Sequence, residues 1–144
     1  MVISQSILFE AKAFLCWDKF SDLSIKLIPI EKAIAFFHPP FKDRATINLF
    51  YEIGTKDYSP VLCLLFHEAG HFRQWQKFSS QNRADDFETW TDIDKGEQKV
   101  QFEREAWTLG EELLNEFLIK INMDQNNLKD YYNCYAEQSY LTYK

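Results

Sequence analysis

The stretch LLFHEAGHF, residues 64–72, places two of the chain's three histidines on either side of a glutamate inside an apolar run. On a helix, His67 and His71 lie on one face about 6 Å apart along the axis, so both imidazoles can reach one ion. Glu68 projects about 100° further around the helix and can hold a water on the open side of that ion. The spacing matches the HExxH pattern of two zinc ligands and a general base.

A core helix that happens to carry two histidines is the alternative, because a five-residue motif also arises by chance. The surroundings favour the metal site. Glu68 follows the apolar run VLCLLF, and a carboxylate is costly to bury there without a cation or a hydrogen-bond donor beside it. A bound metal would remove that cost.

Bulk properties exclude several classes of function. The chain has 144 residues, enough for one domain with a hydrophobic core but too few for two, so we expect a single domain over residues 1–144. The formal net charge of −6 disfavours binding to nucleic acid or to an anionic membrane surface. The N-terminal residues lack the pattern of a signal peptide, and three scattered cysteines cannot build a disulfide framework. We therefore expect a cytoplasmic protein.

Apolar periodicity predicts an α+β fold. Three runs rich in branched and aromatic residues, SIKLIPI, KAIAFF and ATINLFYEI, predict a small, mostly antiparallel sheet. Helices are predicted over residues 4–20, 59–78, 98–121 and 128–140, the second with Ser59 as N-cap and Pro60 at its first position. Residues 79–97 are polar and acidic, which predicts a long loop with at most a short helical turn. Gly110, inside the third helix, predicts close approach of a neighbouring helix.

Zinc needs a third protein ligand. The metzincin extension would place a glycine at position 74 and a histidine at position 77, where this chain has Gln74 and Lys77, so that class is excluded. The remaining histidine, His38, lies upstream in a proline-flanked turn, which favours a downstream carboxylate. Glu103 and Glu105 are two residues apart, roughly 200° around a helix, so only one of them can face the metal.

Helical position favours Glu105 over Glu103. Glu105 lies on the side of Phe102 and Leu109, the stripe expected to pack toward the HExxH helix. Glu103, which lies beside Lys99, is the fallback.

The pairing of HEAGH with EREAWTLGEELL resembles the gluzincins, zinc peptidases with HExxH on one helix and a glutamate ligand on a second. The second segment looks like the glutamate helix of the ImmA/IrrE-like metallopeptidases, where a Glu-x-Glu-Ala pattern precedes small and apolar residues. This resemblance implies a zincin-like domain over residues 1–144, with a small sheet packed against the HExxH helix. It also implies that the glutamate next to Ala106, which is Glu105, is the third ligand. Trp107 and Gly110 depart from that family's usual residues, so substrate and regulation do not transfer.

The expected function is zinc-dependent hydrolysis of peptide bonds in a peptide or protein substrate. Zn²⁺ held by His67, His71 and Glu105 would polarise the scissile carbonyl. Glu68 would act as the general base. The alternative is a metal-binding regulatory or toxin–antitoxin module without peptidase turnover.

Two features are candidates for binding the substrate or stabilising the oxyanion of the reaction. The strand over residues 46–51 is a candidate edge for binding an extended peptide by strand addition. Tyr131, Tyr132 and Tyr135 are candidate donors to the oxyanion, although packing is the more ordinary role of each.

Overall fold

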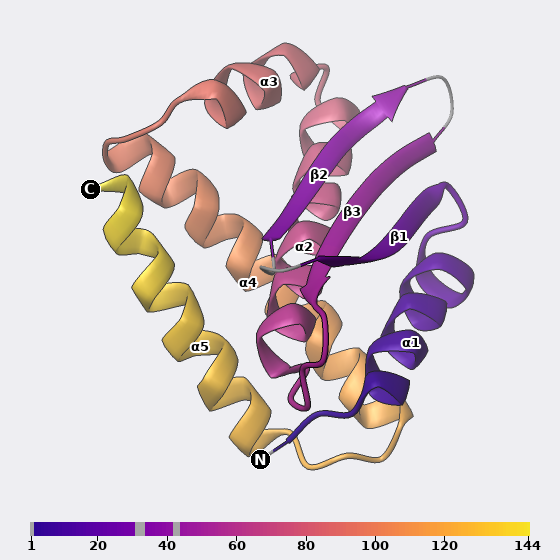
Figure 1. Ribbon diagram of the computed structural model, residues 1–144. Coiled ribbons are helices and arrows are strands. Elements are labelled where there is room, and N and C mark those ends of the chain that lie inside the picture. The colour runs from indigo at the N-terminus through magenta and orange to yellow at the C-terminus, as the bar shows by residue number, and fades with distance from the viewer. Residues whose placement is uncertain (1, 31–33, 42–43) are drawn as a thin grey trace.

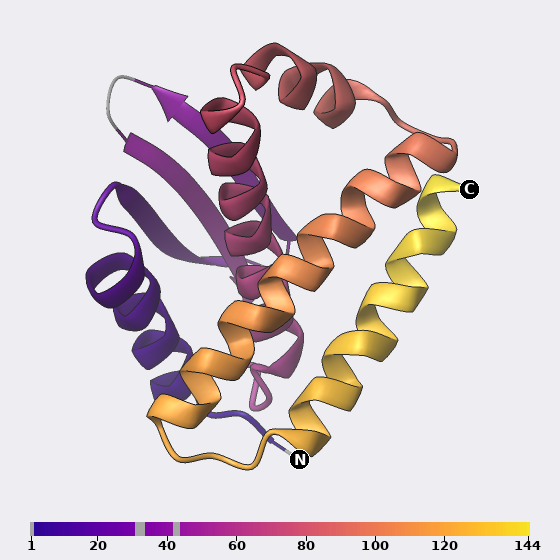
Figure 2. The same cartoon turned by 180° about the vertical axis from the view of Figure 1, so that it is seen from behind.

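The computed structural model describes residues 2–30, 34–41 and 44–144, and Figures 1 and 2 show an α+β arrangement. Five α-helices accompany a three-stranded sheet within these residues. In chain order the elements are α1 Gln5–Ala13, the π-helical turn η1 Phe14–Lys19, β1 Leu23–Ile30, β2 Ile34–Phe41, β3 Arg44–Glu52, α2 Ser59–Ser80, α3 Ala84–Asp92, α4 Glu97–Lys120, α5 Asn126–Tyr140 and the 3-10 turn η2 Leu141–Tyr143. The four predicted helices are therefore confirmed, with small shifts at their ends. None of the helices in the described ranges is long and apolar enough to cross a membrane.

The sheet is mixed, so the expectation of a mostly antiparallel sheet is wrong for one of its two pairings. Its strand order is β1-β3-β2, with β1 parallel to β3 and β2 antiparallel to β3. An apolar run marks a strand but carries no information about which neighbour it joins or in which direction. Lys32 and Ala33, at the start of the second predicted run, lie outside the described residues.

Strand β3 is central, which overturns its expected role as a peptide-binding edge. Both of its sides are paired, to β1 and to β2, so residues 46–51 offer no free edge. Alternate residues Ala45, Ile47 and Leu49 are completely buried. Figures 1 and 2 show that the helices gather on one face of the sheet, with α2 nearest to it. Buried side chains of the sheet and of α1, α2, α4 and α5 build the main core between the sheet and the helices.

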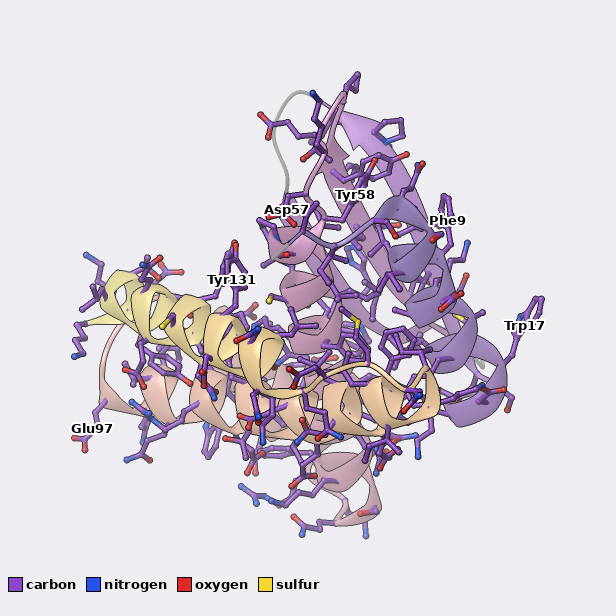
Figure 3. The ribbon with its side chains drawn as sticks, turned by 90° about the horizontal axis from the view of Figure 1, so that it is seen from below. Phe9, Trp17, Asp57, Tyr58, Glu97 and Tyr131 are labelled. Atoms are coloured by element: carbon purple, nitrogen blue, oxygen red, sulfur yellow. The ribbon has the colours of Figure 1, made fainter. Side chains whose placement is uncertain are left out.

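Helix α2 begins at Ser59, so its N-cap residue is Tyr58 and not Ser59 as predicted, and the side chain of Asp57 supports this end of the helix. The carboxylate of Asp57 accepts hydrogen bonds from the Ser59 backbone N–H at 3.0 Å and from the Ser59 hydroxyl at 2.6 Å. It also accepts from the backbone N–H of Ile3 at 3.0 Å, which ties the N-terminal segment to the start of α2. Figure 3 shows Asp57 and Tyr58 together at this end of the helix. The burial of Asp57 opposes its ionisation, yet these hydrogen bonds hold the pKa of the carboxyl below its usual value.

Helices α2 and α4 cross with their backbones in direct contact, as Figure 2 shows. A Cβ atom on Gly70 would meet the backbone carbonyl of Ala106 and lie 2.8 Å from the backbone nitrogen of Gly110. A Cβ atom on Gly110 would meet the carbonyl of Phe66 and the hydroxyl of Tyr132. The close approach predicted from Gly110 is therefore confirmed, and Gly70 is its partner across the crossing.

Residues 79–97 contain a full helix rather than the predicted loop. Helix α3 spans nine residues and has Asp85 and Asp86 in its first turn, where acidic side chains favour the positive end of the helix dipole. Phe87 is buried and packs with Phe78 of α2 and Phe102 of α4 in a cluster separate from the main core. The single buried aromatic on an otherwise polar helix explains why periodicity alone predicts a loop.

Candidate metal centre

Two helices bring three potential ligands together. His67 and His71 lie one turn apart on α2, and Glu103 reaches them from α4. One oxygen of Glu103, Oε2, lies 3.1 Å from Nε2 of His67 and 2.9 Å from Nε2 of His71. The three residues are 5–7% exposed, and among the described residues they form the only group of histidine, cysteine and carboxylate ligands that could hold a metal ion.

The spacing of these atoms suits a small divalent cation. Ligands that bind zinc tetrahedrally at about 2.1 Å lie about 3.4 Å from one another. The two observed nitrogen–oxygen distances, 3.1 and 2.9 Å, are a few tenths of an ångström below that value. The His67–His71–Glu103 group could therefore accept an ion after a small outward movement of the ligands.

Glu105, the preferred third ligand, does not lie with the histidines. Its carboxylate accepts hydrogen bonds from Lys77 Nζ at 3.1 Å and from Gln74 Nε2 at 3.0 Å, at a partly exposed position. The fallback, Glu103, is the glutamate that faces His67 and His71. The geometry thus corrects the choice between the two.

The choice of Glu105 is wrong because the face of α4 that is buried against α2 is not the face expected from the sequence. Leu109 is only half-buried, whereas Lys99 and Trp107, which flank Glu103 on its own face, are 7% and 3% exposed. Glu103, Trp107 and Gly110 follow one another at helical spacing and all face α2. In the sequence, Lys99 one turn before Glu103 suggests that this face of the helix is exposed to solvent. That inference fails because Lys99 itself is buried.

The pKa values of the two histidines are shifted in opposite directions. Burial lowers the pKa of His67, and the hydrogen bond with Glu103 offsets this only in part. For His71 the burial is outweighed by the charge and hydrogen bond of Glu103, so its pKa is raised. Burial would raise the pKa of Glu103, but the charge of His71 and the hydrogen bonds from both histidines hold it well below the usual value. Without a metal, these contacts favour the ionised form of Glu103 and the protonated form of His71.

The two histidines also differ in their outer contacts. Nδ1 of His71 lies 2.9 Å from Oε1 of Gln74, whose amide nitrogen donates to the backbone carbonyl of Phe102 at 2.9 Å. A second hydrogen-bond partner of this kind orients a ligating histidine. Nδ1 of His67 is buried with no hydrogen-bond partner among the described residues, and its ring stacks instead on Trp107 at a centroid distance of 4.1 Å. His67 is thus oriented by packing and His71 by hydrogen bonding.

A pocket of about 340 Å³ opens onto the cluster. Glu68, His71 and Glu103 line it, together with Lys99 and several apolar and aromatic residues. Glu68 is therefore in position to meet a molecule that approaches the cluster. A larger hollow of about 470 Å³ lies between α1 and α4 beside Trp17, whose side chain projects away from the body of the protein in Figure 3. The described residues that line this hollow include no histidine and none of the three candidate ligands.

The three tyrosines proposed as oxyanion donors do not line this pocket. Tyr132 is fully buried and donates its hydroxyl to the backbone carbonyl of Trp107 at 2.7 Å. Tyr131 and Tyr135 pack beside each other on α5. Tyr143, from the turn that follows α5, lines the pocket instead. The sequence offers no signal for it, because only the packing of the turn against the start of α4 brings it there, through a 2.7 Å hydrogen bond from the Gly96 N–H to the Tyr143 carbonyl.

No family model, no characterised protein and no solved structure matches this chain. The assignment of the site therefore depends on the residues and distances given above.

Proposed function

We propose that this protein is a zinc-dependent peptidase in which His67, His71 and Glu103 hold the metal and Glu68 is the general base. The observation that carries the proposal is the convergence of two imidazole Nε2 atoms on one carboxylate oxygen, beside a pocket that His71, Glu103 and Glu68 line. Three protein ligands with a fourth position left for water or substrate is the arrangement of catalytic zinc sites. The likeness of HEAGH and EREAWTLGEELL to the gluzincins, and to the ImmA/IrrE-like peptidases among them, supports a zincin-like fold.

The chemistry divides between the metal and Glu68. When bound, the zinc ion would polarise the scissile carbonyl and lower the pKa of water to about 7. Glu68 would accept the proton of the attacking water and deliver it to the leaving amine nitrogen. The phenol of Tyr143, whose pKa is raised to about 12 by burial and by the charges of Glu103 and Glu68, stays protonated and can donate to the developing oxyanion.

Strand β2 is the better candidate for holding an extended peptide. Within the part of the chain that the structure describes it is an outer strand paired to β3 alone, and its residues Ala35 and Phe37 line the pocket. A peptide could add to its free edge through backbone hydrogen bonds and pass Glu68. Pro39 and Pro40 have no N–H to donate, so such pairing would end near His38.

Metal content and peptide cleavage test the proposal in two steps. The metal-free protein should bind one equivalent of zinc, and the absence of binding would refute both the peptidase and any metal-binding function. The zinc-loaded protein should cleave members of a peptide library, detected by mass spectrometry, and Glu68→Gln should abolish the cleavage while leaving zinc binding intact. Glu105→Gln is the matched control, because that carboxylate lies outside the cluster. Zinc binding without any cleavage would favour the metal-binding regulatory or toxin–antitoxin module.

A further inference from the structure

Lys99 is a buried cation next to the metal cluster. It lies in the first turns of α4, is 7% exposed and lines the same pocket as Glu68 and Glu103. Its ammonium nitrogen lies 3.2 Å from Oε1 of Glu103 and donates to the backbone carbonyl of Thr91 at 3.0 Å. The charge is thus held between the end of α3 and the carboxylate on α4.

Such a position needs an explanation, because removing an ammonium group from water is unfavourable unless its charge and donors are satisfied. Besides Glu103 and Thr91, the ring faces of Phe102 and Tyr143 lie 5.4 and 5.6 Å from the nitrogen. The neighbouring pair of Lys77 and Glu105 is ordinary by comparison: its nitrogen–oxygen distance is 3.1 Å, but the lysine side chain is 54% exposed. Exposed pairs of that kind contribute little.

The two oxygens of Glu103 have separate partners. Oε2 faces Nε2 of both histidines, and Oε1 faces Lys99. We propose that Lys99 is a positioning residue that holds Oε1 away from the ion, so that Glu103 offers the metal a single oxygen. This inference rests on the metal site of the proposed function and adds to it a residue outside the ligand set.

Whether Glu103 offers a metal one carboxylate oxygen or both decides whether a fourth coordination position stays open. With His67, His71 and a single oxygen of Glu103, a bound metal would have three protein ligands and a fourth position for water or substrate. A carboxylate that turned both oxygens toward the ion would compete for that position. By binding Oε1, Lys99 keeps the carboxylate from turning.

Cobalt substitution tests this directly, because the visible bands of Co²⁺ weaken as its coordination number rises. The protein should give the strong bands of a four-coordinate site when the metal-free form is loaded with Co²⁺. Lys99→Met should weaken these bands and should lower zinc affinity, measured by competition with a chelating dye, by about 10–100-fold, as is usual for outer partners of a ligand. Lys77→Met, which removes the exposed lysine from Glu105, should change neither quantity.

The possible results are distinguishable. If Lys99→Met gives the same spectrum and zinc affinity as the unaltered protein, the positioning role is refuted and the metal site stands. If the unaltered protein takes up no cobalt or zinc, the metal site itself is refuted. Far-UV circular dichroism establishes that each variant is folded. Should Lys99→Met not fold, Lys99→Gln replaces it: it also removes the charge, and unchanged cobalt bands there would equally refute the role.

Discussion

Replacing Gly110 by alanine tests the crossing of α2 and α4, because two effects of opposite sign compete there. In an isolated helix the change would stabilise by about 1 kcal/mol through helix propensity. In this protein the new methyl group would meet the backbone carbonyl of Phe66, which cannot swing aside, and the hydroxyl of Tyr132. Overpacking of this kind costs about 1–3 kcal/mol.

The collision with Tyr132 adds a second cost. Its hydroxyl donates to the Trp107 carbonyl at 2.7 Å inside the core, and displacing it leaves a buried polar group unpaired, at about 1–3 kcal/mol. Taken with the gain in propensity, Gly110→Ala should destabilise the metal-free protein by about 3 kcal/mol. At about 2–4 °C per kcal/mol for a chain of this size, Tm should fall by roughly 6–12 °C.

Urea unfolding followed by circular dichroism, with EDTA present throughout, measures the change in the free energy of unfolding. Thr108→Ala is the control, since Thr108 is exposed on the same helix and its replacement should shift stability by no more than about 0.5 kcal/mol. An increase in stability for Gly110→Ala, as propensity alone predicts, would show that the two backbones do not touch at this point.

Three further results are expected. Glu103→Gln should weaken zinc binding by more than about 100-fold, a larger loss than removal of an outer partner causes. Glu105→Gln should leave the dissociation constant for zinc unchanged. A larger loss of zinc affinity in Glu105→Gln than in Glu103→Gln would restore Glu105 as the ligand. The metal-free protein should be most stable near pH 6.5, the ordinary pKa of histidine. Because the pKa of His71 is raised in the folded state, its contribution to stability is lost as the pH rises through that pKa. Because the pKa of His67 is lowered, the folded state loses stability as the pH falls below 6.5. Urea midpoints that change steadily in one direction between about pH 5 and 8 would contradict this assignment of the two rings. Tyr143→Phe should reduce kcat by about 100-fold, with little change in KM or zinc content, and an unaltered kcat would remove the phenol from the reaction.

The sequence predicts most of the helices because their signals are local. Ser59 and Pro60 mark the start of α2, and apolar residues recur at helical spacing along α2 and α4, so each helix can be placed from its own residues. The direction of β1 relative to β3 is not local, since it depends on β3 lying between two strands that precede it in the chain. The same limit applies to α3, whose helix depends on packing of Phe87 against residues from two other helices.

The same distinction between local and distant signals applies to the candidate metal ligands. His67 and His71 share one helix, so their spacing alone predicts that they face one ion. Glu103 comes from another helix, and choosing it requires knowing which face of α4 is buried. Lys99 marks that face, but a lysine is almost never fully buried unless it is paired. In the structure Lys99 is buried because it pairs with Glu103. In the sequence the same lysine, one turn before Glu103, suggests that this face of the helix is exposed.

Stability and metal binding should be coupled in this protein, because the glycine crossing and the candidate metal site share one interface. Gly70 lies directly before His71 on α2, and Gly110 lies two turns beyond Glu103 on the same face of α4. The distance between the two backbones therefore helps to set the distance from Glu103 to the histidines. A side chain that forces the helices apart at Gly110 should weaken zinc binding as well as folding, although it touches no ligand. A substitution in α3, which packs through a separate aromatic cluster, should alter access to the pocket with a smaller effect on the ligand geometry.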